Sequence, residues 1–299
     1  MESVAESPIA NRTKLTAWLP LVVLPVVVSL FAFEWPAWLF MWTLALSIYA
    51  GLKWLSFADS IEASESTAGR SLGYLLLWPG MNAKSFFASP HVEQPRLREW
   101  ILAVTKLALG VYLVVVAVPF VEHDRMVAGW IGMTGIAFTL HFGLFHLLSV
   151  MWRRANCDAR PVMNAPILAT SLSDFWSRRW NLAFRDLAHT YVFRRFVGRI
   201  GIAGATMAVF VVSGVVRDVA ISGAAGGGYG LPTLYFVIQG VGVLFERSRL
   251  GKRIGTRKGV IGRLFCAAVI LGPVCLLFHP PFVERVVVPM LTVIGSIWE

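Results

Sequence analysis

Long apolar runs separated by shorter polar connections dominate this chain. A bilayer core of about 30 Å requires roughly 20 apolar residues per helix. Apolar stretches of about this length, the last of them shorter, lie near residues 16–33, 37–55, 101–121, 127–151, 200–222, 229–246, 260–278 and 286–298. We therefore expect an all-α fold, a polytopic membrane protein of about eight transmembrane helices. We expect residues 1–299 to form a single membrane-embedded domain.

The composition supports a membrane protein and excludes other classes. Of the 299 residues, 57% are hydrophobic and 15% are charged, far from the range of soluble globular domains. The net charge of +10 could indicate a nucleic-acid partner, but the basic residues fall in connections between apolar runs, so we expect none. The three cysteines, Cys157, Cys266 and Cys275, form no CxxC pair, so we expect no disulfide framework and no metal site.

The distribution of Lys and Arg predicts the orientation. The connections 152–199 and 247–263 are rich in these residues and are separated by two apolar stretches, so they face the same side. Cytoplasmic loops carry the excess of Lys and Arg in membrane proteins. Alternation of the spans then puts the N-terminus in the cytoplasm, and we expect a multi-pass protein of a bacterial inner membrane.

One polar segment, residues 171–196, is patterned like an amphipathic helix. Ser171 followed by Asp174 resembles an N-terminal capping box. Aromatic and aliphatic residues then recur at spacings of three or four, and they share one helical face: Leu172, Trp176, Trp180, Phe184, Leu187 and Tyr191. A helix with aromatics on one face and arginines on another lies in the membrane interface. This interpretation assigns no catalytic or binding role to the segment.

The sequence FWSRRWN at residues 175–181 carries a family resemblance. It resembles the aromatic block, ending in Asn, of the membrane-bound O-acyltransferases. The residues before it, Ser171-Leu172, and after it, Phe184-Arg185-Asp186-Leu187, are similar to the wax synthase branch of that family. The resemblance covers about residues 75–250.

The resemblance implies transfer of a fatty acyl group from acyl-CoA to a long-chain alcohol or another lipid hydroxyl, giving a wax ester. Acyl-CoA is then the acyl-donor substrate rather than a bound cofactor, and the other partners are the lipid alcohol and membrane lipids. We expect Asn181 to orient the acyl group or to stabilise the oxyanion. The expected substrate-binding residues are Trp176, Trp180, Arg178, Arg179 and Arg185.

The residue that takes the alcohol proton is the open question. The family uses a histidine, in an apolar helix, within a context like Ser-Gly-x-x-His-Asp. Here that context is SGVVRD at residues 213–218, so Arg217 stands at the histidine position and Asp218 follows it. Arginine stays protonated and cannot act as a base, but it could stabilise a developing oxyanion as a fixed cation.

Three interpretations of Arg217 remain open. Catalysis could use another base, the protein could be a catalytically degenerate relative, or the arginine could reach the membrane interface. A lipid-binding or transport protein without chemistry is the alternative from a different class.

Two histidines in the fourth apolar stretch, His141 and His146, are the candidate replacements for the base. We expect Asp218 to keep a supporting role and His189 to be structural. The remaining histidines, His91, His123 and His279, are expected near the membrane surface.

Overall fold

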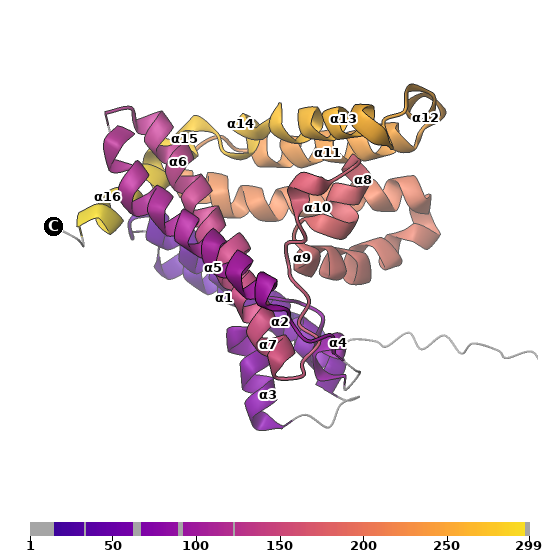
Figure 1. Cartoon of the computed structure of the whole chain (residues 1–299), viewed down its shortest axis with the longest axis horizontal. Coiled ribbons are helices and arrows are strands. Elements are labelled where there is room, and N and C mark those ends of the chain that lie inside the picture. Colours follow the sequence, from indigo (N-terminus) through magenta and orange to yellow (C-terminus); the bar gives the residue numbers. More distant parts are fainter. Residues whose placement is uncertain (1–14, 33, 62–66, 89–91, 122, 297–299) are drawn as a thin grey trace, which may run out of the picture.

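The computed structural model describes residues 15–32, 34–61, 67–88, 92–121 and 123–296. Over these residues every regular element is a helix, as expected (Figure 1). The α-helices are Leu19–Phe31 (α1), Ala37–Ile61 (α2), Ala68–Leu72 (α3), Ala83–Phe87 (α4), Leu97–Tyr112 (α5), Arg125–Ala137 (α6), Phe145–Arg154 (α7), Leu172–Asp174 (α8), Leu182–Leu187 (α9), Arg194–Ala225 (α10), Leu231–Arg247 (α11), Arg249–Ile254 (α12), Gly259–Leu271 (α13), Val274–Leu277 (α14), Pro280–Phe282 (α15) and Val288–Ser296 (α16).

Wider π-helical turns join several of these helices. They are Gly73–Leu77, Leu113–Ala117, Phe138–Leu144, Phe175–Arg179, Ala188–Phe193 and Val283–Val287. Such turns are rare and occur often at functional sites. Two of them, Phe138–Leu144 and Phe175–Arg179, contain candidate site residues, so the local backbone there departs from a regular α-helix.

Five helical runs among the described residues are long and apolar enough to cross a membrane: Ala37–Ser60, Leu97–Ala117, Arg125–Arg154, Leu182–Ala225 and Gly259–Leu277. The protein is therefore a polytopic helical membrane protein. The stretches expected near 16–33, 229–246 and 286–298 form shorter helices. Leu15–Phe31 and α11 each have 17 residues, and α16 has 9.

The run Leu182–Ala225 is divided at Gly201, whose φ of 68° and ψ of 178° are not helical. The chain folds back there, since the Phe184 ring contacts the Arg217 guanidinium from the other half of the run. Gly201 lacks a Cβ and tolerates this backbone conformation, which other residues rarely adopt. The two halves are therefore separate helices.

The prediction of one continuous helix over residues 171–196 is wrong, because the helix is interrupted at Trp180 and Asn181. The Ser171 hydroxyl accepts the Asp174 N–H at 3.1 Å and begins α8, as the capping pattern predicts. The helix then stops at Trp180, which is extended (φ −104°, ψ 126°), and Asn181 adopts left-handed dihedrals (φ 43°) before α9 starts. Leu172 and Trp176 pack in one core cluster and Leu187 in another, because the break turns the two halves toward different neighbours.

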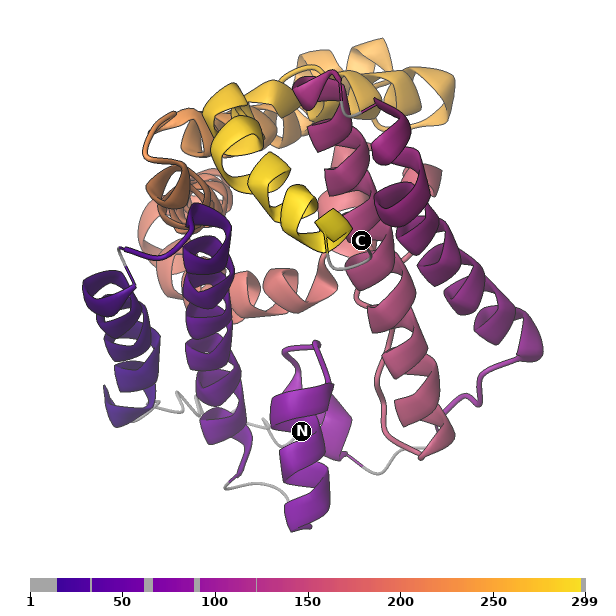
Figure 2. The same cartoon turned by 90° about the vertical axis from the view of Figure 1, so that its left-hand side faces the viewer.

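The helices pack side by side in pairs. In Figure 2, α1 and α2 lie together on the left, while α5 and α6–α7 lie together on the right. Small residues allow the second pair to approach closely. A Cβ added to Gly110 would lie 2.3 Å from the Thr139 nitrogen, and one added to Gly143 would lie 2.6 Å from the Leu107 Cα. The helix α10 packs against both α2 and α11.

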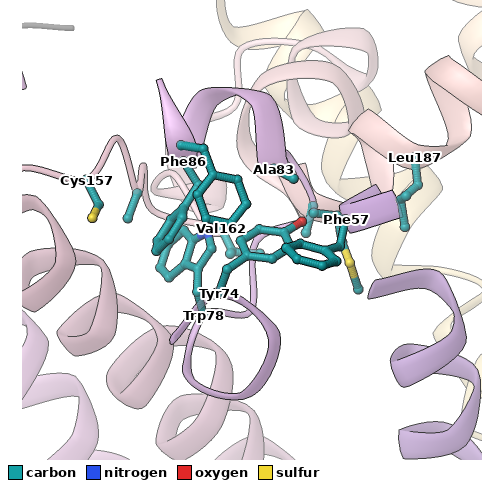
Figure 3. Close-up of a cluster of buried hydrophobic side chains, with 12 residues drawn as sticks. Phe57, Tyr74, Trp78, Ala83, Phe86, Cys157, Val162 and Leu187 are labelled. Carbon is teal, nitrogen blue, oxygen red and sulfur yellow. The ribbon is translucent and has the colours of Figure 1, made fainter. Parts of the chain in front are cut away.

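A buried lysine fixes the loop between α3 and α4 onto α2. Lys53, 1% exposed, donates to the carbonyl oxygens of Trp78, at 2.7 Å, and Gly80. Its ammonium also lies 3.4 Å from the centroid of the Tyr74 ring. Tyr74 and Trp78 belong to the aromatic cluster drawn in Figure 3, together with Phe86. Residues 79–81 are thereby held against the central cavity described next.

Candidate functional site

A central cavity of about 380 Å³ lies between α2, the bend Phe138–Leu144, α9 and α10. Its walls are mostly apolar and come from residues 41–52 of α2, from Pro79 and Met81, and from residues 216–221 of α10. His141, Asn181 and Arg217, from three separate segments, also line it. The cavity therefore combines an apolar enclosure with a few polar groups, as binding sites for small lipophilic molecules usually do.

Arg217 is held by aromatic rings rather than by a carboxylate. Its guanidinium carbon lies 4.8 Å from the centroid of the Phe184 ring and 4.5 Å from that of the Phe236 ring. One guanidinium nitrogen donates to the Ser213 carbonyl at 2.9 Å. Among the described residues no acidic side chain forms an ion pair with Arg217. The cation keeps donors that a ligand oxygen in the cavity could use.

Asn181 has a structural task as well as a place in the cavity wall. Its Oδ1 accepts the Phe184 N–H at 3.2 Å and caps α9. Its backbone N–H donates to the Met163 sulfur at 3.2 Å. The side-chain Nδ2 donates to no group in the described part of the chain. The cap fixes the amide, and the other end of the amide remains available as a hydrogen-bond donor.

The structure separates the two histidines of the fourth apolar stretch. His141 lies on the π-helical bend, lines the central cavity and packs edge-on against Phe145, with ring centroids 5.3 Å apart. His146 lies on α7 outside the residues that line the cavity, and its Nδ1 is buried without a hydrogen-bond partner among the described residues. Only His141 is brought to Asn181 and Arg217.

Asp218 points away from the cavity and joins α10 to α11. Its Oδ2 accepts the Gly230 N–H and the Thr233 hydroxyl, both at 2.8 Å. Its Oδ1 is buried and has no partner in the described part of the chain. The carboxylate therefore stabilises the start of α11, next to Arg217 but not in the same cavity.

The family model described as "Membrane bound O-acyl transferase family" matches residues 159–238, which include Asn181, Arg217 and Asp218. This part of the chain is similar to that family. His141 lies outside the matched range.

The relatives that this chain matches are named as O-acyltransferases. Probable long-chain-alcohol O-fatty-acyltransferase 1 of Arabidopsis thaliana is 35% identical over 142 residues, which are 44% of this chain and 40% of the relative. Long-chain-alcohol O-fatty-acyltransferase of Simmondsia chinensis is 46% identical over 70 residues, 21% of this chain and 20% of the relative. Acyl-CoA–sterol O-acyltransferase 1 of Arabidopsis thaliana is 28% identical over 116 residues, 35% and 34% of the two chains. The chain thus spans less than half the length of these relatives, and the resemblance to the wax synthase branch is confirmed over these partial lengths.

The block at 175–181 and the residues just before it are held from α11 by two buried side chains that the sequence analysis missed. The Glu246 carboxylate accepts the backbone N–H groups of Leu172, at 2.7 Å, and Ser173, at 3.2 Å. The Gln239 Oε1 accepts the Trp176 indole N–H at 3.3 Å. Both α11 side chains are fully buried. A carboxylate and an amide within an apolar stretch were the available signal, since such residues rarely lie there without a partner.

The other aromatic residue of the block, Trp180, packs between rings. It stacks on Phe175 with ring centroids 5.4 Å apart, and it meets Phe142 edge-on at 6.1 Å. Phe142 belongs to the same bend as His141. Trp180 thus packs the bend against the block at 175–181.

The three arginines expected to bind substrate lie in different surroundings. Arg178 is exposed. Arg179 donates to Asp174 at 2.6 Å and to the Ala165 carbonyl at 3.2 Å. Burial alone would raise the pKa of Asp174, but its contacts with Arg179 hold that pKa below its ordinary value. Arg185 pairs with Asp186 and donates to the Ser177 carbonyl at 2.8 Å.

A polar cavity of about 240 Å³ adjoins the central one, because Met81, Val162 and Ala183 line both. Arg160 and Arg185 line it together with Asp158 and Asp186. It brings two arginines and two aspartates next to the central cavity.

The remaining histidines take other roles. His279 is fully buried rather than near the surface: its Nε2 lies 3.1 Å from the Ser222 hydroxyl, and its Nδ1 accepts the Phe282 N–H at 3.3 Å. His123 is exposed. His189 stacks on Phe193 with centroids 5.4 Å apart. His91 lies outside the described residues. Within those residues no group of three or more His, Cys, Asp or Glu could hold a metal ion.

Proposed function

We propose that this protein transfers a fatty acyl group from acyl-CoA to a long-chain alcohol or another lipid hydroxyl, forming an ester of the wax type. The observation that carries the proposal is the central cavity, in which His141, Asn181 and Arg217 line one apolar enclosure. The names of the relatives support the reaction class. The whole chain, residues 1–299, acts as one acyltransferase domain in this proposal.

In the proposed reaction His141 takes the proton from the alcohol hydroxyl. The alcohol oxygen attacks the thioester carbonyl of acyl-CoA and forms a tetrahedral oxyanion. The Asn181 Nδ2–H and the Arg217 guanidinium stabilise that charge. The carbon–sulfur bond then breaks, the coenzyme A thiolate takes the proton back from His141, and the ester remains.

The apolar walls of the central cavity, with Trp42 among them, hold the lipid chains. The polar cavity admits the charged part of acyl-CoA, with Arg185 as its cation nearest to the block at 175–181. Arg178, Arg179 and the aromatic pair Trp176 and Trp180 support this route by shaping the block. In this proposal the N-terminus is cytoplasmic, in a bacterial inner membrane, and the shorter apolar helices complete about eight crossings.

A catalytically inactive, lipid-binding relative is the second candidate. The fixed aromatic packing of Arg217, at the position of the family histidine, is the observation that favours it. Such a protein would bind or move a lipid and would form no ester.

The test is ester formation in a host without wax esters, supplied with a fatty alcohol. We expect the wild type to form esters, and His141→Ala to lower the rate about 10²–10⁴-fold, the usual contribution of a general base. The matched control, His123→Ala, changes an exposed histidine and leaves the rate unchanged. Full activity of His141→Ala would refute the base assignment. Absence of esters from the wild type, with transport of a lipid by purified protein in liposomes, would favour the second candidate.

A further inference from the structure

A third cavity, of about 280 Å³, is lined in part by Trp176 and Ser177 of the block 175–181 and shares no lining residue with the central cavity. It shares Arg185 with the polar cavity. It is lined by residues of the 173–193 segment, of α10 and of α11, among them Ser173, Trp176, Arg185, His189 and Arg247. We call it the basic cavity. The proposed reaction does not use it as a site for the reacting groups.

The charge of the basic cavity has one sign. Arg185 and Arg247 are the cations that line it, with His189 beside them, and no Asp or Glu lines it among the described residues; Arg185 already pairs with Asp186 outside the cavity. Arg247 makes no hydrogen bond or ion pair within the described part of the chain. Since an arginine presents five donors in a planar fork, Arg247 keeps its full capacity for an anionic ligand.

A buried hydroxyl without a partner also lines this cavity. The Ser173 Oγ is shielded from solvent and makes no hydrogen bond with any described group. Such a group is costly unless something else supplies its partner. The nearby Glu246 does not serve, because its carboxylate accepts backbone N–H groups at the start of α8. A ligand oxygen in the cavity would satisfy the hydroxyl.

The other walls are apolar. The Trp176 indole N–H is already bonded to Gln239, so its ring offers a flat apolar surface. Phe193, Val209 and Phe210 continue that surface. Arg247 is the last residue of α11, so its cation lies at a helix end, and the apolar residues Val209, Phe210 and Val243 line the cavity with it. An anionic head with a hydrocarbon chain fits this order, and the surrounding membrane supplies such molecules.

We propose that the basic cavity binds the phosphate head of an anionic phospholipid. The phosphate lies between Arg247 and Arg185 and accepts the Ser173 hydroxyl, while the first part of one acyl chain packs along Phe193 and Phe210. Arginine suits a phosphate because its fork donates two parallel hydrogen bonds. This site shares Arg185 with the proposed acyl-CoA route, but it requires no acyl transfer, so a lipid can bind whether or not an ester forms.

Native mass spectrometry of the full chain in nanodiscs tests the proposal. The probes are phosphatidylglycerol in phosphatidylcholine, and phosphatidylcholine alone. We expect one retained phosphatidylglycerol on the wild type, and about tenfold weaker retention on Arg247→Gln, since one hydrogen bond to a charged group is removed. Arg249→Gln is the matched control, because Arg249 is an exposed arginine two residues away that does not line the cavity.

Three results would overturn the proposal. The first is equal retention of phosphatidylglycerol by the wild type and by Arg247→Gln. The second is a loss of retention in Arg249→Gln as large as that in Arg247→Gln. The third is retention of phosphatidylcholine by the wild type as strong as that of phosphatidylglycerol. A further arm adds free coenzyme A, which also carries phosphate esters. Displacement of the phospholipid by coenzyme A would assign the cavity to the acyl donor instead. Ser173→Ala, which removes only the hydroxyl, should weaken retention without changing the charge.

Discussion

Arg217→Met is the most informative change to the proposed catalytic group. The substitution keeps an unbranched apolar side chain between the Phe184 and Phe236 rings and removes the cation. The folded protein loses two cation–π contacts, about 0.5–1 kcal/mol each, and the hydrogen bond to Ser213, about 1 kcal/mol. The substitution also removes the unfavourable free energy of placing an arginine within a membrane helix, about 2.5–3.5 kcal/mol on the insertion scale, which stabilises the variant. These contributions nearly cancel, so we expect little change in stability.

The expected effect on catalysis is much larger. Removing one donor to an oxyanion costs about 10²–10³ in kcat, or about 2.7–4 kcal/mol. Because the oxyanion exists only in the transition state, kcat should fall while KM changes little. Arg217→Lys keeps the charge but loses the planar fork, so its activity should lie between that of the wild type and that of Arg217→Met.

The assay is ester formation by purified protein in detergent or nanodiscs, with a long-chain acyl-CoA and a long-chain alcohol. Arg199→Met, at an exposed arginine near the fold-back at Gly201, is the matched control and should keep wild-type kcat. A wild-type kcat for Arg217→Met, or a change confined to KM, would refute the oxyanion role. Arg217→His completes the series: esters formed only by that variant would identify the natural protein as an inactive relative.

Further predictions concern the cavity wall and the fold-back. Asn181→Asp keeps an oxygen that accepts the Phe184 N–H but loses the Nδ2 donor, so it should fold normally and lose about 10²-fold or more in kcat. Asn181→Ala should lower the melting temperature as well, because it also removes the cap of α9. Full activity of both variants would contradict the donor role. Trp42→Ala should enlarge the central cavity and shift the esters formed toward longer chains, as mass spectrometry of the products would show; an unchanged chain-length profile would contradict this. Gly201→Ala should destabilise the protein by about 1–3 kcal/mol, because the φ of 68° at this position disfavours a side chain. The space itself is open, since no atom lies within 4 Å of an added Cβ. The measurement is thermal unfolding in detergent, and an unchanged melting temperature would contradict the strain argument.

The membrane class and much of the helical plan follow from local sequence. Runs of apolar residues predict helices because only helices and closed barrels satisfy every backbone group within lipid. The Ser171 cap was predictable for the same local reason, since its hydroxyl reaches the N–H three residues later. The block at 175–181 was sufficient to indicate the family, because its residue types and order are specific. Arg217 was visible as a cation at the histidine position.

Only the tertiary structure decided which residues share the site. Helical periodicity put Trp180 and Phe184 on one face, but the backbone breaks at Trp180–Asn181, where packing on Phe175 and the cap of α9 outweigh regular helix geometry. Glu246 and Gln239 hold the block from 74 and 63 residues away, and no local pattern connects them to it. His141 and His146 look alike in sequence. The π-helical bend and the packing of α2, α9 and α10 place His141 in the cavity wall. The sequence specifies which residues share a face of one helix, but which faces contact one another depends on the whole fold.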